Sequence, residues 1–331
     1  MRVALVGAGR QGRRRAPAVY GVEGCELAVV ADIEGAEGLA REMGCEAVER
    51  WEEAVERPDI ESIIVCTPPH LHSAIAVAAM RAGKHVLCEK PLARTVAEAE
   101  EMVRASEEQG VVLKCGFNLR HHPGVQQARA WLYEGRLGEP IFARLRYGVG
   151  GRPGFEQEWR ARAEVSGGGQ LMDQGVHALD LCRWFLGEFA SVSATLTTGY
   201  WEIEPLEDNA FVTLSTARGR VASVHASQTQ WRNLFSLEVY GREGYAQVDG
   251  LGGGYGTERA ALGRRDPCGP FREEAIEYRG EDVSWREEWR EFVSAVREER
   301  APLGSGRDGL EALRLAAAAY RSNESGRTVA V

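Results

Sequence analysis

The glycine-rich segment at residues 7–12 constrains the fold of this 331-residue chain more than any other stretch. A strand-like run at residues 2–6 leads into it, and a second apolar run at residues 27–31 ends at Asp32. In a G-x-G-x-x-G turn the glycines allow a tight bend and a close approach to pyrophosphate, and the following helix presents its amides to phosphate. The spacing therefore predicts a dinucleotide-binding unit at the start of the chain.

Asp32 indicates which dinucleotide binds, because it lies about twenty residues after the glycine loop, where an acid contacts the adenosine ribose. Its carboxylate would accept hydrogen bonds from the ribose hydroxyls and repel a 2′-phosphate, which favours NAD over NADP. The arginines at 13–15 keep NADP possible, although such a run is also typical of a solvated helix face. We expect the cofactor contacts here to come from Gly7, Gly9, Arg10, Gln11, Gly12 and Asp32.

Strands and helices then alternate up to about residue 117. The pattern predicts helices at 35–43, 51–56, 71–81 and 95–108, and strands at 60–66, 85–88 and 111–117. This alternation is typical of a doubly wound parallel sheet, which binds ligands at the carboxyl ends of its strands. The loops at those ends, and the start of the helix expected at 71–81, supply further cofactor contacts. The residues are Thr67, Pro68, His72, Glu89, Lys90 and Asn118.

The segment at residues 167–180 is the second candidate site. If the residues after Gly169 form an α-helix, Asp173, His177 and Asp180 lie on one polar face of it. Gly175 within that helix costs about 1 kcal/mol relative to alanine, which suggests that another group approaches the backbone closely. The segment alone leaves two interpretations open, a catalytic carboxylate and imidazole or a core helix with satisfied polar groups.

Composition excludes several classes of protein. The net charge of −9 argues against nucleic acid as the main partner, and no apolar run approaches the length of a membrane span. The seven cysteines are dispersed without a C-x-x-C pair, so we expect neither a disulfide framework nor a metal site. With no recognisable leader before the first strand, the expected location is cytoplasmic.

The alternation stops after Pro123, which indicates two domains, residues 1–120 and 121–331. A helix at 125–134, a strand at 141–147 and a glycine-rich loop at 148–154, a candidate lid, precede the second candidate site. Period-2 segments then predict an antiparallel meander, and two helices end the chain; the strands are 192–198, 209–215, 220–228, 234–240 and 245–249, and the helices 285–299 and 307–321.

Six segments of the sequence match one known pattern. They are the glycine loop, residues 66–72 (CTPPHLH), residues 85–92 (HVLCEKPL), residues 116–118 (GFN), Trp159-Arg160, and residues 167–180. On these segments the chain resembles the Gfo/Idh/MocA oxidoreductases, named for glucose-fructose oxidoreductase and inositol dehydrogenase. The resemblance covers essentially the whole chain, and the Glu-Lys-Pro motif joined to Gly-Gly-x-x-x-Asp-x-Gly-x-His-x-x-Asp is specific to that family.

The resemblance implies an α/β Rossmann domain followed by an α+β domain with a large open, mostly antiparallel sheet. The exposed face of that sheet is implied to mediate a homo-oligomer, a dimer or a tetramer. The implied catalytic residues are Lys90, Asp173 and His177, which with Asn118 and Arg160 also contact the substrate.

The main functional hypothesis is hydride transfer between NAD and a secondary hydroxyl of a sugar, sugar derivative or cyclitol. His177 would take the hydroxyl proton while Lys90 stabilises the developing charge, although the sequence leaves open which of the two is the proximate acceptor. Two alternatives remain: a glycosidase or epimerase that uses retained NAD, and a sensor that binds NAD(P) without catalysis. The direction of reaction is also open.

Two sets of side chains bear on the substrate. Aromatic rings and planar guanidinium groups suit polyhydroxylated ligands, although each also suits packing; the candidates are Arg146, Tyr147, Trp201, His225 and Trp231. A nucleotide-linked sugar is a further possibility, because several arginines could pair with a diphosphate: Arg120, Arg144, Arg146, Arg152 and Arg162.

Overall fold

The computed structural model describes residues 1–269 and 272–331 and divides the chain into two compact units. Unit 1 comprises Met1–Asn118 and Val283–Leu313, and unit 2 comprises Leu119–Asp282 and Arg314–Val331. This division differs from the predicted domains 1–120 and 121–331, because the chain returns to unit 1 after Asp282. Helix α10 (Gly306–Ser325) then carries the chain from unit 1 back into unit 2.

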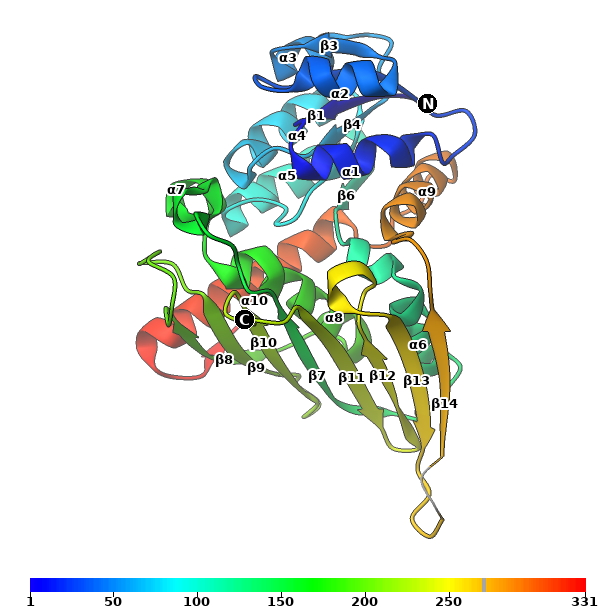
Figure 1. The fold of residues 1–331 in the computed structure, drawn as a ribbon, viewed down its shortest axis with the longest axis vertical. Helices are drawn as coiled ribbons and strands as arrows, with labels where there is room; N and C mark the ends of the chain where they lie inside the picture. Colours follow the sequence, from blue (N-terminus) through cyan, green and yellow to red (C-terminus); the bar gives the residue numbers. More distant parts are fainter. Residues whose placement is uncertain (270–271) are drawn as a thin grey trace. The chain divides into compact units, whose positions relative to one another are not determined.

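Within the described residues, unit 1 is built on a six-stranded parallel sheet in the order β3-β2-β1-β4-β5-β6 (Figure 1). Its strands are β1 (Arg2–Val6), β2 (Glu26–Ala31), β3 (Glu46–Val48), β4 (Ser62–Val65), β5 (His85–Cys88) and β6 (Leu113–Cys115). The strand order reverses between β1 and β4, the point at which doubly wound sheets bind dinucleotides. The predicted doubly wound fold is confirmed, and the short strand β3 was not predicted.

Six helices accompany this sheet in the described chain: α1 (Arg10–Val19), α2 (Ala36–Met43), α3 (Trp51–Glu56), α4 (His72–Arg81), α5 (Val96–Gln109) and α9 (Ser284–Arg297). The sequence predicted α9 as a helix of the second domain. Trp289, Phe292 and Val293 of α9 are buried in one cluster with Leu27 and other residues of unit 1. The apolar face of α9 thus completes the core of the cofactor fold.

Unit 2 holds, among its described residues, a nine-stranded sheet in the order β14-β13-β12-β11-β7-β10-β9-β8-β15. The strands are β7 (Pro140–Gly148), β8 (Ser191–Thr197), β9 (Asn209–Ser215), β10 (Val221–Ser227), β11 (Leu234–Gly241), β12 (Gly244–Asp249), β13 (Glu258–Arg264), β14 (Glu273–Tyr278) and β15 (Val329–Ala330). The prediction of a mostly antiparallel sheet is confirmed. The prediction of a simple meander was wrong, because β7 lies between β11 and β10 and runs parallel to β10.

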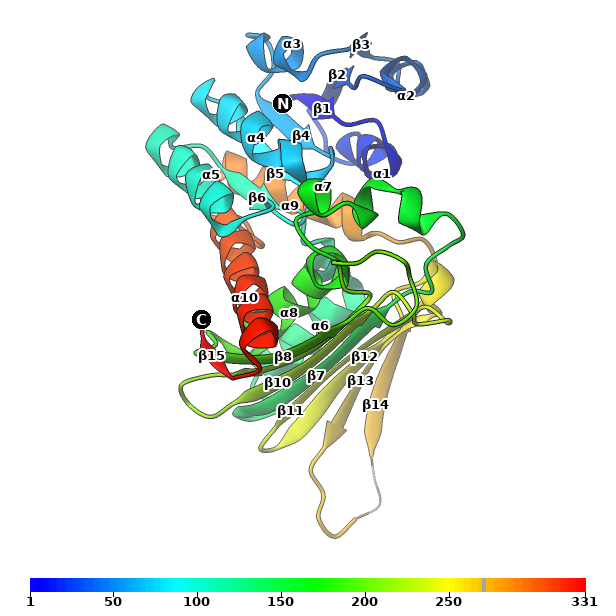
Figure 2. The ribbon, with the colours of Figure 1, turned by 90° about the vertical axis from the view of Figure 1, so that its left-hand side faces the viewer.

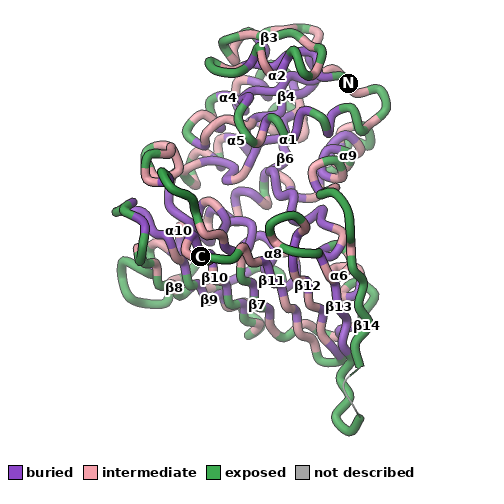
Figure 3. The backbone as a smooth tube through the Cα atoms, viewed as in Figure 1, coloured by how far each residue is buried: buried purple, intermediate pink, exposed green. Residues whose placement is uncertain are grey.

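Helices cover one face of this sheet and leave the other open (Figure 2). Helices α6 (Pro123–Tyr133), α8 (Val176–Leu186) and the last part of α10 lie on the covered face. Strand β7 alternates accordingly, with Ala143 and Leu145 buried and Arg144 and Arg146 exposed. This period of two is the one expected where a sheet has one covered face. Figure 3 shows the chain coloured by burial, with buried residues (purple) along the strands of this sheet.

Helix α9 ends in an unusual way. The N–H of Arg300 donates to the carbonyl of Ala295 at 3.0 Å and that of Glu299 to Val296 at 3.3 Å, which is the Schellman arrangement. The residue after the helix cap is left-handed in this arrangement, and glycine normally occupies it. Glu299 occupies it here with φ 52°, and among the described residues it alone is a non-glycine residue with positive φ.

The substitution Glu299→Gly should therefore stabilise the protein. Glycine adopts positive φ without the steric cost of a Cβ atom, and we expect a gain of about 0.5–1 kcal/mol in the free energy of unfolding. Urea denaturation followed by circular dichroism measures it. The control is Glu298→Gly, where φ is −95° and glycine relieves no strain. An equal gain in the free energy of unfolding in both variants would show that the positive φ of Glu299 is not strained.

Candidate active site

The glycine loop of unit 1 is shaped by two close backbone contacts. A Cβ atom on Gly7, whose φ is 105°, would lie 2.6 Å from the carbonyl carbon of Cys66, and one on Gly12 would lie 2.0 Å from the Gly7 oxygen. A Cβ atom on Gly9 would meet nothing within 4 Å. Packing of the protein itself thus requires glycine at 7 and 12, whereas glycine at 9 leaves open space for a ligand to approach the backbone.

The start of helix α1 can hold an anion. Gly9 is its N-cap and provides no side-chain cap, and the first amides of an α-helix have no partner within the helix. Two polar atoms near this turn, Gln11 Oε1 and Thr67 Oγ1, are buried without a hydrogen-bond partner in the part of the chain that the structure describes. A ligand with phosphates, hydroxyls and an amide would satisfy these groups, and NAD carries all three.

Asp32 holds the glycine loop from the end of β2. Its Oδ2 accepts the N–H of Ala8, and its Oδ1 accepts the N–H of Glu34 at 2.9 Å. The carboxylate is half-buried, and each oxygen has a further lone pair. This geometry agrees with the expected role of Asp32 as the acceptor for ribose hydroxyls.

Three predicted cofactor residues instead support the loops. His72 is fully buried, with Nδ1 at 2.9 Å from the Pro91 oxygen and Nε2 at 2.8 Å from the Thr67 oxygen. Glu89 is 4 % exposed and forms an ion pair with Arg15, and the Asn118 amide donates to Ser284 at 3.0 Å. The side chains of His72 and Glu89 thus support the strand-end loops, and a direct contact of these residues with the cofactor stays a prediction.

Lys90 follows Glu89 at the end of β5 and is half-buried. Its N–H donates to Glu89 Oε2 at 3.2 Å, so the carboxylate of one residue of the motif fixes the backbone of the next. The other two lysines are buried elsewhere in unit 1, where Lys84 donates to the carbonyls of Arg57 and Ile60. Of the three lysines, Lys90 is thus the one that is not fully buried.

The second candidate site, in unit 2, has a different local structure from the one predicted. A π-helical turn, Leu171–Gly175, precedes α8, so the regular α-helical spacing from Gly169 is wrong. A π turn contains an extra residue and changes the direction in which its side chains point. Asp173 is consequently half-exposed while His177 is buried, at 5 % exposure, one turn further on.

Asp180 forms a buried ion pair with Arg120. Both of its oxygens face the Arg120 guanidinium, with Nε to Oδ2 at 2.8 Å and Nη2 to Oδ1 at 2.6 Å. Both side chains are buried. Asp180 thus anchors α8 in the core, three residues after His177 in the same helix.

Asp173 lies beside Arg160, with Arg160 Nε 3.6 Å from Asp173 Oδ2. The same guanidinium stacks over the ring of Trp159 at 4.3 Å. These three side chains form a partly exposed cluster of a cation, an anion and an aromatic face. Such a set can bind hydroxyl groups through both donors and acceptors.

His177 lies next to an aromatic group on the covered face of the sheet. The ring of Tyr147 meets it edge-on at 6.2 Å, and Tyr147 in turn contacts Tyr255 at 5.6 Å. The side chain of Gln174 donates to the Tyr255 hydroxyl at 3.1 Å. Tyr255 and Gln174 were missed because a loop tyrosine and a helix glutamine carry no periodic signal.

Other residues considered for the substrate lie elsewhere. Arg146 and His225 face the open side of the sheet, since their strand neighbours Leu145 and Ala226 are buried on the covered side. Trp201 is buried in a cluster with Phe155, and its Nε1 donates to the Gln228 carbonyl at 3.0 Å. Trp231 is 66 % exposed and contacts Tyr200 at 4.8 Å.

Glu207 caps the helical segment that carries Asp173 and His177. Its Oε1 accepts from the N–H of Leu171 at 2.9 Å and from the Tyr320 hydroxyl at 2.9 Å, and its Oε2 accepts from the N–H of Gly169 at 3.3 Å. A Cβ atom on Gly169 would lie 2.2 Å from the backbone carbonyl oxygen of Glu207 and 2.8 Å from its side-chain Cδ, and one on Gly168 would lie 2.2 Å from the Tyr320 hydroxyl. The glycines thus make room for this cap.

Gly175 also has a packing role. A Cβ atom there would lie 2.8 Å from Leu171 Cδ1 and 3.5 Å from the Cβ atom of Ala226 in β10. The expected close approach to the helix backbone is therefore present. It comes from the neighbouring turn and from the sheet.

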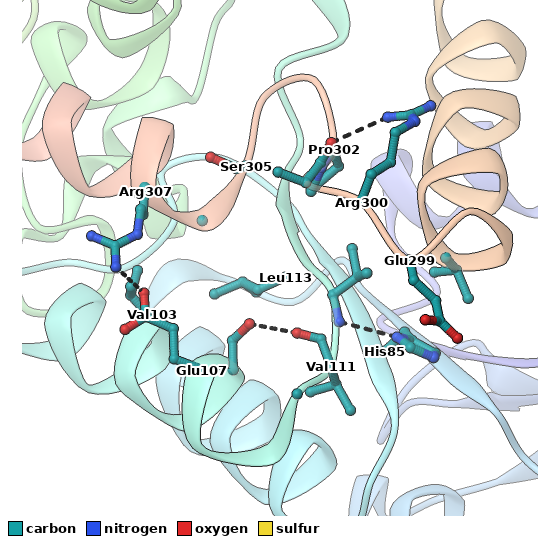
Figure 4. A pocket seen from close by; sticks show the side chains of 16 residues that line it. His85, Val103, Glu107, Val111, Leu113, Glu299, Arg300, Pro302, Ser305 and Arg307 are labelled. Atoms are coloured by element: carbon teal, nitrogen blue, oxygen red, sulfur yellow. Dashed lines mark hydrogen bonds and ion pairs between the residues drawn. The ribbon is translucent and has the colours of Figure 1, made fainter.

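A cavity of about 510 Å³ opens in unit 1 at the amino ends of β5 and β6 (Figure 4). In it Glu107 pairs with Arg307, and His85 Nδ1 accepts the N–H of Val112 at 3.0 Å. None of the predicted cofactor residues lines it. Over residues 1–269 and 272–331 there is also no cluster of three His, Cys, Asp or Glu side chains that could hold a metal, and no helix is long and apolar enough to cross a bilayer.

Sequence comparison assigns both parts of the chain. Residues 1–117 match a family described as "Oxidoreductase family, NAD-binding Rossmann fold", and residues 125–247 match "GFO/IDH/MocA C-terminal domain". The chain is 37% identical over 192 residues to levoglucosan dehydrogenase of Pseudarthrobacter phenanthrenivorans, a match that covers 57% of this chain and 49% of the relative. It thus spans about half the length of that relative.

Two comparisons extend over the full length. Inositol 2-dehydrogenase of Rhizobium meliloti is 29% identical, with 100% of this chain and 99% of the relative covered. The solved structure of levoglucosan dehydrogenase in complex with NADH has a TM-score of 0.92 at 25% identity and covers 100% of this chain and 99% of that one. The predicted fold and the NAD cofactor are confirmed by these matches.

The cap that Glu207 forms should contribute measurably to the free energy of unfolding. Burial raises the pKa of the Glu207 carboxyl, although hydrogen bonds from Leu171, Tyr320 and Gly169 oppose the shift. Glu207→Ala would leave buried donors without partners, and we expect a loss of about 1–3 kcal/mol in the free energy of unfolding.

The sign of the pH effect follows from the raised pKa. The folded state binds the proton more tightly than the unfolded state, so the stability contributed by Glu207 is full below the ordinary pKa of a glutamate and falls as pH rises through the raised value. Urea denaturation at a series of pH values should therefore show the wild type and Glu207→Ala converging as pH increases. The control is Glu202→Ala on the same loop, an exposed position; divergence with rising pH would refute the assignment.

Proposed function

Because the chain belongs to the Gfo/Idh/MocA family of NAD-binding oxidoreductases, we propose that it transfers a hydride between a secondary hydroxyl of a carbohydrate or cyclitol and nicotinamide. The observation that carries the proposal is the glycine loop, where Gly9 faces open space and Gln11 Oε1 lies buried without a partner in the described chain. Such a loop is suited to a pyrophosphate-linked dinucleotide.

Bound NAD supplies the acceptor for the hydride. In our proposal His177 accepts the proton of the reacting hydroxyl, and its buried position beside Tyr147 shields that proton transfer from water. Lys90 donates a hydrogen bond to the same oxygen and stabilises the negative charge that develops there. Asp173 and Arg160, which form an ion pair, orient neighbouring hydroxyl groups of the substrate.

A small cyclic polyol is favoured over a nucleotide-linked sugar. Most arginines that could bind a diphosphate are paired with acids of the protein, as in Arg120 with Asp180 and Arg152 with Glu158. Levoglucosan and inositol, after which the relatives are named, are cyclic polyols. We therefore propose a substrate of this class with adjacent ring hydroxyls.

We further propose that the protein forms a homo-oligomer through the open face of the nine-stranded sheet. Aromatic pairs stand on that face, with Phe211 stacked on His225 at 4.1 Å and Phe142 on Tyr240 at 4.7 Å. Phe211 is 48 % exposed, which is typical of a surface that a partner covers. Sedimentation equilibrium should give an oligomer mass for the wild type and a smaller mass for Phe211→Glu. A monomer mass for both proteins would contradict the proposal.

The reaction can be tested by its stoichiometry. A panel of levoglucosan, myo-inositol, glucose and nucleotide sugars should show NADH formation in proportion to substrate consumed, with NAD preferred to NADP because of Asp32. Turnover of a glycoside or an epimerisable sugar without net NADH would favour a retained-NAD mechanism instead. Cofactor binding with no turnover on any panel member would favour a sensor.

His177→Ala should lower kcat by about a hundredfold or more, since a positioned general base contributes that much to proton transfer. The affinity for NADH, measured by its fluorescence, should stay unchanged. His85→Ala is the matched control, because that imidazole lines the cavity at the amino ends of β5 and β6, which none of the predicted cofactor residues lines. Full hydride transfer in His177→Ala would show that another group is the base.

A further inference from the structure

Four charged side chains form a buried network in unit 1. Arg15 of α1 contacts Glu89 at 2.6 Å and Glu288 of α9 at 2.9 Å, and Lys114 of β6 lies 3.9 Å from Glu288. None of the four side chains is more than 5 % exposed. On the rim, Glu291 lies 3.5 Å from Lys114.

The space around Arg15 is fitted to its guanidinium. The ring of Trp285 lies 4.8 Å from Arg15 Cζ, and a Cβ atom on Gly116 would lie 2.7 Å from Arg15 Nη2 and 3.1 Å from the Glu89 Cα atom. Glycine at 116 is thus required for the guanidinium to pass between the ends of β5 and β6. A planar group held on both sides leaves the Glu89 carboxylate little freedom to move.

Stability alone does not account for this network. Burial is the largest influence on Glu288 and raises the pKa of its carboxyl, against the opposing effect of Arg15 and Lys114. Desolvating several ions can cost more than their attraction returns, so apolar side chains of similar volume would stabilise the fold equally well. A buried charge network therefore points to a requirement for fixed geometry.

The network fixes the position of the Lys90 backbone. One oxygen of Glu89 binds Arg15 Nε and the other accepts the Lys90 N–H, while the Glu89 N–H donates to the Val65 carbonyl of β4 at 2.9 Å. A change in the position of the Glu89 carboxylate would thus move the Lys90 backbone directly. Glu288, by holding the second nitrogen of Arg15, determines where that carboxylate lies.

We propose that Arg15 and Glu288 are positioning residues for Lys90, so that helix α9, near the end of the chain, sets the placement of a catalytic group in the cofactor unit. The inference rests on the proposed role of Lys90. Neither of the two matched family regions, residues 1–117 and 125–247, includes Glu288. If Glu288 positions Lys90, its replacement should change the reactivity of the Lys90 amine without changing the affinity for NAD.

Chemical labelling of Lys90 tests this independently of activity. The chain has three lysines, at 84, 90 and 114, and in the structure Lys84 and Lys114 are buried. Acetic anhydride should thus modify Lys90 first, and peptide mass spectrometry gives its rate at each pH. In Glu288→Gln we expect that rate to change by about threefold or more, since a displaced amine meets different solvation and charges.

A double-mutant cycle on turnover completes the test. Glu288→Gln should lower kcat by about tenfold, because small misplacements of a catalytic group are costly, and leave the Kd for NADH within about twofold. In a Lys90→Met background the same change should lower kcat no further. Arg15→Lys, which keeps the charge but loses the second contact, should resemble Glu288→Gln.

The matched control is Glu291→Gln, the same substitution on the same helix. Glu291 contacts Lys114 and Arg300 and, within the described part of the chain, forms no ion pair with Arg15. Its loss should therefore leave kcat and the labelling of Lys90 unchanged. Equal losses of kcat from Glu288→Gln with and without Lys90, or unchanged labelling, would overturn the inference. Full turnover in Lys90→Met would instead refute the proposed role of Lys90, while altered labelling in Glu288→Gln would still support the positioning.

Discussion

The close backbone contact between the glycine loop and the end of β4 is the constraint on which unit 1 depends. Gly7 takes a positive φ and lets the carbonyl of Cys66 approach to a distance that a Cβ atom would forbid. This contact seats β1 beside β4 at the reversal of strand order. The ring nitrogens of His72 then join the loop after β4, at Thr67, to the loop after β5, at Pro91.

A comparable constraint organises the candidate site of unit 2. Two glycines leave room for Glu207 and Tyr320 at the start of the helical segment, and the cap satisfies amides that would otherwise be buried without partners. Asp173 lies in the π turn that follows, and His177 lies in the first turn of α8. One side chain faces an arginine on a partly exposed surface and the other lies buried beside a tyrosine, an arrangement suited to two different tasks.

Buried charge recurs in both units with a similar purpose. Arg120 with Asp180 fixes α8, and Arg15 with Glu89 and Glu288 fixes the loop of Lys90. Such pairs add little net stability, because desolvation offsets their attraction. The hydrogen bonds from Arg120 to Asp180 and from Arg15 to Glu89 are nevertheless directional and hold a backbone in one position, which apolar contacts do less well. In both units one member of the ion pair lies in the segment that carries a proposed catalytic residue, Asp180 in the helix of His177 and Glu89 next to Lys90.

The sequence by itself determined the elements whose signal is local. The glycine loop, the acid after β2, the alternating strands and helices and the motifs around Lys90 and His177 all depend on short spacings, and they predicted the fold class, the family and NAD. Only the tertiary structure decided which charges meet. Asp180 joins Arg120, Glu207 caps a helix that begins before it in the chain, and Glu288 returns to Arg15. Periodicity reports which face of an element is buried, but an ion pair between distant segments leaves no periodic trace, because its geometry exists only once the sheets and helices have packed.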